Sequence, residues 1–139
     1  MPLTGYKVLD LTQARAGPTS VRLLADWGAT VIRIKPPSTL DAAQAEEAEG
    51  EVGQEDPDTQ NLHRNKRGLA LNLKSDEGRK VFMELARQCD VVVENFRADV
   101  KHRLGVDYDA VAKVNPRIIY ASISGFGQTG PYSGRPGVD

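Results

Sequence analysis

A strand–helix–strand pattern within residues 6–35 limits the folds open to this chain more than any other feature. The runs Lys7–Leu11 and Thr30–Ile34 are short and largely apolar, which is typical of strands. Between them, apolar residues recur at three- and four-residue spacings from Val21 to Gly28, which predicts one face of a helix. Because parallel strands need a crossover of about a dozen residues or more, this spacing predicts a parallel sheet with a right-handed crossover.

The same alternation continues along the chain. Residues 67–73 and 117–124 have the pattern of strands. Residues 90–94 form an apolar run with polar ends, as expected of a strand covered on both faces. Strands that alternate with helices predict the α/β fold class, with a mainly parallel sheet and flanking helices.

Helical segments are predicted between these later strands. Ser75 is expected to cap the first of them through its hydroxyl group. Two shorter helices are predicted near residues 100–104 and 108–114. The first helix is predicted to bury a face made of Val81, Leu85 and Ala86.

Residues 36–64 differ from the rest in composition. Pro36 and Pro37 end the preceding strand, and residues 41–58 contain eight acidic residues and no Lys or Arg. Low hydrophobicity with concentrated charge predicts that 36–64 is an acidic mobile loop.

Charge and composition argue against several functional classes. Lys and Arg number 18 against 19 Asp and Glu, so the chain lacks the basic balance of a nucleic-acid-binding protein, and no nucleic-acid partner is expected. No apolar run approaches the roughly 20 residues that cross a bilayer, so no membrane partner is expected. No export signal is visible, and the single cysteine, Cys89, cannot form an internal disulfide, which predicts a cytoplasmic protein. His63 and His102 lack metal-ligand spacing, so no metal site is predicted.

A glycine motif follows the last predicted strand. Gly125–Gly130 matches the G-x-G-x-x-G pattern of dinucleotide sites. That site also needs a helix after the third glycine, whereas Pro131–Gly137 is rich in proline and glycine. We therefore predict a glycine loop at the carboxyl end of a strand and no NAD site.

Cations and one amide follow the predicted strands, where ligands of open α/β sheets bind. Arg15 follows the first strand and Lys74 follows the strand at 67–73. Asn95 and Arg97 follow the strand at 90–94, and Arg103 comes shortly after them. This grouping favours a phosphorylated, adenine-bearing ligand.

Six blocks of sequence occur in a familiar order. They are residues 8–32, Asn65–Lys74, Glu94–Arg97, Arg103–Gly105, Asn115–Arg117 and Ser124–Gly127. Together they resemble the family III coenzyme A transferases, the group that includes formyl-CoA transferase and carnitine CoA-transferase. The resemblance implies a large Rossmann-like domain, a small domain and an interlocked homodimer. It identifies residues 1–139 as an incomplete N-terminal portion of the large domain.

The resemblance also implies a chemistry. Coenzyme A moves from an acyl-CoA thioester to a carboxylic acid through an aspartyl acyl anhydride and then an aspartyl CoA-thioester. CoA and acyl-CoA are substrates, and no permanently bound cofactor is expected. The nucleophilic aspartate lies beyond Asp139, and Asp139 is an accessory acid candidate. The implied CoA contacts are Arg15, Ala16, Leu71, Asn72, Leu73, Lys74, Asn95, Phe96, Arg97 and Arg103.

Two alternatives remain open at this stage. One is α-methylacyl-CoA racemase, whose relatives carry a proton-transfer histidine in a Gly-His-Asp step. This chain has Gly137-Val138-Asp139, which favours the transferase. The second alternative, from another functional class, is an inactive CoA-binding fragment or module.

Overall fold

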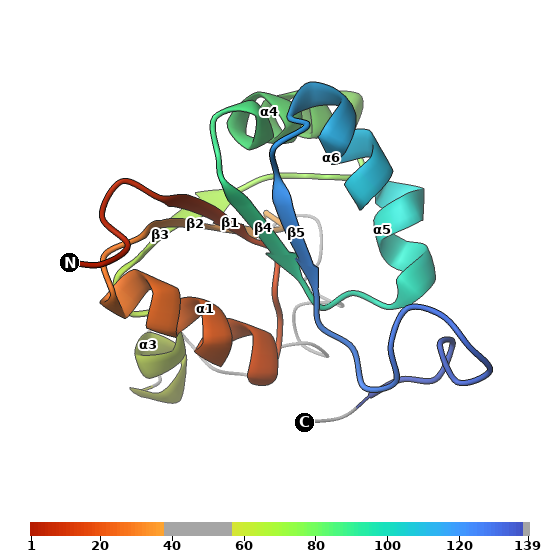
Figure 1. Cartoon of the computed structure of the whole chain (residues 1–139), viewed down its shortest axis with the longest axis horizontal. Helices are drawn as coiled ribbons and strands as arrows, with labels where there is room; N and C mark the ends of the chain where they lie inside the picture. The colour runs from red at the N-terminus through yellow and green to blue at the C-terminus, as the bar shows by residue number, and fades with distance from the viewer. Residues whose placement is uncertain (38–56, 138–139) are drawn as a thin grey trace.

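Five parallel strands form a single sheet in the computed structural model, which describes residues 1–37 and 57–137 (Figure 1). The strand order is β3-β2-β1-β4-β5, so β1 lies at the centre of the sheet. Each neighbouring pair is parallel, and this confirms the predicted α/β class. The strands are β1 (Lys7–Asp10), β2 (Thr30–Lys35), β3 (Lys66–Ala70), β4 (Val91–Glu94) and β5 (Ile119–Ser122).

Helices cover both faces of this sheet. Figure 1 shows α1 and α3 on one side and α4, α5 and α6 on the other. The helices are α1 (Ala16–Asp26), α3 (Pro57–His63), α4 (Asp76–Arg87), α5 (Ala98–Leu104) and α6 (Tyr108–Val114). The predicted helix at 108–114 matches α6, and the helix predicted near 100–104 begins two residues earlier as α5.

The alternation of side chains along the strands divides the core into two clusters. In β1, Val8 packs on the α1 side with Val21 and Val31. Its neighbour Leu9 packs on the opposite side with Phe82 of α4 and further apolar residues. Successive side chains of a strand point to opposite faces, so one short strand contributes to both layers of the core.

Residues 57–63, within the predicted acidic mobile loop at 36–64, form helix α3. Residues 38–56 lie outside the described residues, so the mobile loop stays a prediction there. No residue of α3 is buried, but Asp58 at its start pairs with Arg15, and Arg64 just after it pairs with Asp26 at 2.6 Å. These two ion pairs therefore join α3 and the residue after it to the two ends of α1.

One prediction from sequence is wrong, and it concerns the buried face of α4. Val81, which was predicted to be buried, is 46% exposed, and the adjacent Phe82 is completely buried. The face that packs on the sheet repeats every fourth residue through Gly78, Phe82 and Ala86. The predicted cap is confirmed, because the Ser75 hydroxyl accepts a hydrogen bond from the Gly78 backbone N–H at 3.0 Å.

Candidate functional site

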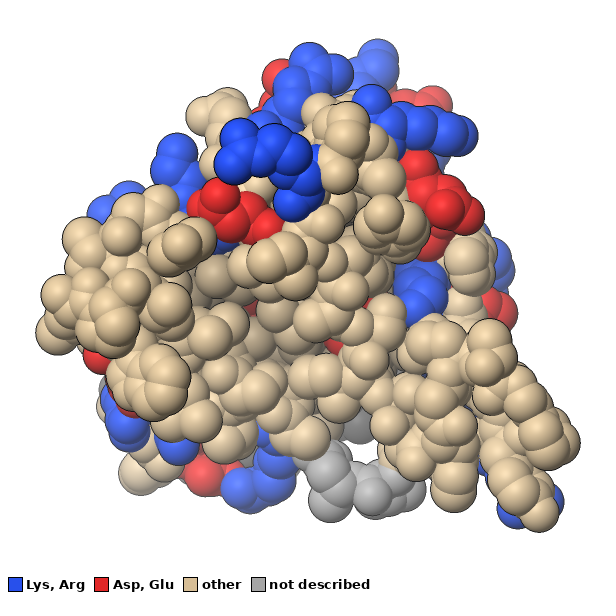
Figure 2. All heavy atoms as spheres, viewed as in Figure 1, with Lys and Arg blue, Asp and Glu red and all other residues tan. Residues whose placement is uncertain are grey.

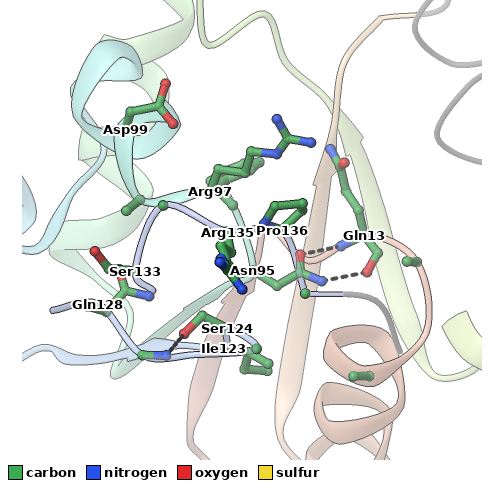
Figure 3. Close-up of a pocket in the computed structure, with 18 residues that line it drawn as sticks. Gln13, Asn95, Arg97, Asp99, Ile123, Ser124, Gln128, Ser133, Arg135 and Pro136 are labelled. Carbon is green, nitrogen blue, oxygen red and sulfur yellow. Dashed lines mark hydrogen bonds between the residues drawn. The ribbon is translucent and has the colours of Figure 1, made fainter. Parts of the chain in front are cut away.

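A cleft of about 770 Å³ lies at the carboxyl ends of β1, β4 and β5 (Figure 3). Its walls come from three segments that follow these strands. In Figure 3, Gln13 lies on one side and Ser133 and Gln128 lie on the other. The lining residues are Gln13, Ala14, Ala16, Asn95, Phe96, Arg97, Ala98, Asp99, Ile123, Ser124, Gly125, Gly127, Gln128, Ser133, Gly134, Arg135, Pro136 and Gly137.

Reciprocal hydrogen bonds join the segment after β1 to the segment after β4. The Gln13 backbone N–H donates to Asn95 Oδ1 at 2.8 Å, and Asn95 Nδ2 donates to the Gln13 carbonyl at 2.7 Å. These two residues are 82 positions apart in the chain. The Asn95 amide therefore uses both of its ends to hold two walls of the cleft together.

A buried ion pair supports the same region from the α1 side of the sheet. Lys66 Nζ donates to Asp10 Oδ2 at 2.8 Å and to the Pro18 carbonyl in the first turn of α1 at 3.0 Å. The other Asp10 oxygen accepts from the backbone N–H and the hydroxyl group of Thr12. Burial lowers the pKa of Lys66, and the adjacent Asp10 opposes that shift. This pair fixes both ends of the segment between β1 and α1.

A second buried ion pair supports the cleft from the opposite side of the sheet. Glu94 Oε1 accepts from Lys101 Nζ at 2.8 Å, and Glu94 Oε2 accepts from the Phe96 backbone N–H at 2.8 Å. Burial and the negative charge of Glu94 raise the pKa of the nearby Tyr120 well above its ordinary value. The Tyr120 hydroxyl donates to the Val106 carbonyl at 2.8 Å.

Cations at the cleft are few. Figure 2 shows Lys and Arg side chains gathered mainly over α4 and α6, whereas the segment after β5 is largely uncharged in this view. Arg97 and Arg135 line the cleft, and neither makes an ion pair within residues 1–37 and 57–137. The Arg135 guanidinium lies 4.4 Å from the centre of the Tyr132 ring. Arg97 is therefore an exposed charge suited to an anionic ligand.

Comparison with known proteins decides the family. A family model described as CoA-transferase family III matches residues 3–139. The chain belongs to this family. It is 43% identical over 138 residues to acetyl-CoA:oxalate CoA-transferase of Acetobacter aceti, covering 99% of this chain and 35% of that enzyme. It is 41% identical to succinyl-CoA:glutarate CoA-transferase of Homo sapiens, covering 99% of this chain and 31% of that enzyme.

Solved structures agree with this assignment. A CAIB/BAIF family protein from Brucella suis superimposes with a TM-score of 0.83 at 34% identity, covering all of this chain and 37% of that protein. Rv3272 from Mycobacterium tuberculosis gives a TM-score of 0.81 at 32% identity, covering 99% of this chain and 36% of that protein. The family III chain thus spans about a third of the length of these relatives.

Four of the ten CoA contacts expected in this family III chain meet at the cleft. Ala16 lies at the start of α1, and Asn95, Phe96 and Arg97 follow β4. Phe96 is half-buried and also packs against the core cluster around Leu9, so only part of its ring faces the cleft. The binding roles of these residues stay predictions.

The other six do not line the cleft. Arg15 pairs with Asp58 of α3, and Arg103 lies beside Asp99 on α5 with 3.7 Å between Nε and Oδ2. Residues 71–74 follow β3, the edge strand farthest from β5. Of these four, Leu71 and Leu73 pack against the core, Asn72 begins the turn into α4, where its carbonyl accepts from Ser75, and Lys74 is exposed. Asp139 lies outside the described residues.

Sequence reasoning missed several residues of the site. Gln13, Gln128 and Arg135 line the cleft, although nothing in the linear pattern singled them out. The buried ion pairs left a signal that could have been used, because Asp10 and Glu94 are acids at the ends of apolar strands. A charged residue in such a position is almost never fully buried unless it is paired.

Residues 1–37 and 57–137 contain no group of three or more His, Cys, Asp or Glu side chains arranged to hold a metal ion. None of their helices combines the length and the apolar character that crossing a membrane requires.

Proposed function

We propose that this chain forms the CoA-binding part of an enzyme that moves coenzyme A from an acyl-CoA thioester to a carboxylic acid. The single observation that carries the proposal is the cleft at the carboxyl ends of the parallel strands, with Arg97 at its side and a glycine-rich segment as one wall. Ligands of open α/β sheets bind at this edge. The names of the matched relatives, which pair a CoA thioester with oxalate or glutarate, support the substrate class.

Each wall of the cleft has a role in this proposal. Arg97 binds a phosphate group of CoA, and the exposed part of Phe96 packs against the adenine ring. Backbone N–H groups of the glycine-rich segment stabilise the oxyanion that develops on the thioester carbonyl. Ala16 lies at the beginning of α1 and leaves room for the ligand where the chain turns from β1 into the helix.

The proposed reaction uses an aspartate beyond residue 139. Its carboxylate attacks the thioester carbonyl, CoA leaves as the thiolate, and an aspartyl acyl anhydride forms. The CoA thiolate then attacks the aspartyl carbonyl of the anhydride, which gives an aspartyl CoA-thioester and releases the first acid. The second carboxylic acid takes the CoA by the reverse of these two steps.

The racemase alternative finds less support. Such a reaction needs an imidazole placed at the α-carbon of the acyl group. His102 lies on α5 beside Asp107 with 3.6 Å between Nδ1 and Oδ2, and it does not line the cleft. Position 138, where the racemases carry their histidine, is valine.

Three further points belong to the same proposal. Residues 1–139 correspond to the N-terminal portion of the large domain. The match to about a third of each relative supports only that the chain is a part of a longer protein of this family. The complete enzyme is an interlocked homodimer. It acts in the cytoplasm.

The test is calorimetric titration of CoA into the 139-residue chain. We expect saturable binding, and we expect Arg97→Ala to raise the Kd about tenfold because a charge-assisted contact is lost. Arg117→Ala is the matched control, since Arg117 is an exposed arginine that precedes β5 at the other end of the sheet. Absence of binding, or equal effects of the two substitutions, would contradict the proposal.

A second assay tests whether residues 1–139 transfer CoA without the proposed nucleophile. The chain is incubated with acetyl-CoA and oxalate, and the thioesters formed are identified by mass spectrometry. Because the proposed nucleophile lies beyond residue 139, we expect binding without any new thioester. Formation of oxalyl-CoA by residues 1–139 would contradict the placement of the nucleophile beyond residue 139.

A further inference from the structure

Lys101 is a buried ammonium group that joins three segments around the cleft. Its side chain is 8% exposed and extends from α5 toward the end of the sheet. Nζ donates to Glu94 Oε1 at 2.8 Å, to Ser122 Oγ at 2.9 Å and to Gln128 Oε1 at 2.6 Å. An ammonium group has three N–H donors and no acceptor, so these contacts use its full capacity.

The contact with Lys101 determines the orientation of the Gln128 side-chain amide. Because Lys101 only donates, the atom of Gln128 that faces it must be the carbonyl oxygen. The amide nitrogen Nε2 is consequently directed away from Lys101. It finds no acceptor within residues 1–37 and 57–137, and Gln128 lines the cleft (Figure 3).

The same ion pair links this orientation to the opposite wall. Glu94 is completely buried, and while one of its oxygens accepts from Lys101 the other accepts from the Phe96 backbone N–H. Gln128 and Phe96 both line the cleft. One buried network therefore sets the position of an amide donor relative to the segment that carries Arg97.

We propose that Lys101 is a positioning residue that presents the Gln128 Nε2–H group to a carbonyl oxygen of the bound CoA ligand. This inference rests on the proposed function, because it takes a CoA ligand as the occupant of the cleft. A neutral amide donor suits a carbonyl oxygen, whereas the anionic phosphates are matched by the arginines. The carbonyl belongs either to a pantetheine amide or to the acyl thioester.

Two substitutions of Gln128 test its role as a donor, and one substitution of its neighbour is the control. Gln128→Glu keeps an oxygen for Lys101 but removes the N–H donor, and Gln128→Leu removes both. We expect both to raise the Kd for acetyl-CoA about tenfold. Thr129→Glu is the charge control, because it adds the same charge one residue along without changing a cleft-lining side chain, and we expect a change of less than about threefold.

Comparing two ligands identifies the oxygen. Equal losses for CoA and acetyl-CoA assign the contact to a pantetheine amide, which both contain. A loss for acetyl-CoA alone assigns it to the thioester carbonyl. If wild-type Kd values are retained in Gln128→Glu and Gln128→Leu, the inference is overturned while the proposed function stands. If the wild-type chain binds neither CoA nor acetyl-CoA, both the inference and the proposed function are overturned.

The positioning role of Lys101 needs its own readout. Lys101→Met alone leaves Glu94 buried without its ion partner, so the variant to use is Lys101→Met combined with Glu94→Gln. In the wild-type chain, NMR signals of the Gln128 side-chain NH₂ group are expected to shift when CoA is added. In the double variant, we expect binding to persist with this shift lost. A retained shift would contradict the positioning role.

Discussion

The substitution Lys66→Met tests how strongly the buried ion pair between β3 and β1 stabilises the fold. The side chains of Lys66 and Asp10 are 1% and 0% exposed. Removing the ammonium group leaves Asp10 with its two contacts from Thr12 but without its counter-charge, and it frees the Pro18 carbonyl. Removal of one partner of a buried pair costs roughly 3–5 kcal/mol, which is a large part of the ~5–15 kcal/mol that stabilises a typical domain.

Urea-induced unfolding followed by circular dichroism measures this loss. Lys80→Met is the matched control, because Lys80 is an exposed lysine of α4, and its expected effect is within about 0.5 kcal/mol. Asp10→Asn combined with Lys66→Met should recover part of the loss, since Asn keeps an oxygen for Thr12 without a buried charge. A loss below about 1 kcal/mol for Lys66→Met would refute the reasoning that an unpaired Asp10 is costly.

Three other predictions follow from single contacts. In Gly125→Ala the new Cβ would lie 2.7 Å from the Gly137 Cα, so we expect thermal unfolding to show a free energy of unfolding lowered by about 1–3 kcal/mol. Gly134→Ala is the control and should leave this free energy unchanged, because no atom lies within 4 Å of the new Cβ. Because folding raises the pKa of Tyr120, the neutral Tyr120 phenol stabilises the folded chain below about pH 10, and this contribution decreases as the pH rises further. Between pH 9 and pH 11, the free energy of urea unfolding should therefore fall more for the wild-type chain than for Tyr120→Phe. An equal fall in the two proteins would contradict this prediction. Burial raises the pKa of the Cys89 thiol, so the folded chain should react with a thiol reagent far more slowly than the chain in urea; equal rates would place this side chain at the surface.

Local patterns were sufficient to predict the elements that build the sheet. Alternation and helical spacing identified the segments of β1, α1 and β2, and the polar ends of the run at 90–94 marked β4. Errors arose where neighbours in space overrode the local pattern. Val81 and Phe82 are both apolar, and only packing on the sheet selects which one is buried. Helix α3 buries none of its residues, and ion pairs join it and the residue after it to the two ends of α1.

The candidate site was predictable in its location but only partly in its composition. Periodicity and turn residues are properties of a few consecutive positions, so they determined the α/β class and the edge where a ligand binds. The pairs Lys66 with Asp10 and Lys101 with Gln128 are 56 and 27 residues apart, and they meet because of strand order and register. Gln13, Gln128 and the two buried lysines depend on those long-range contacts, since a side chain becomes part of a site only where the folded chain directs it.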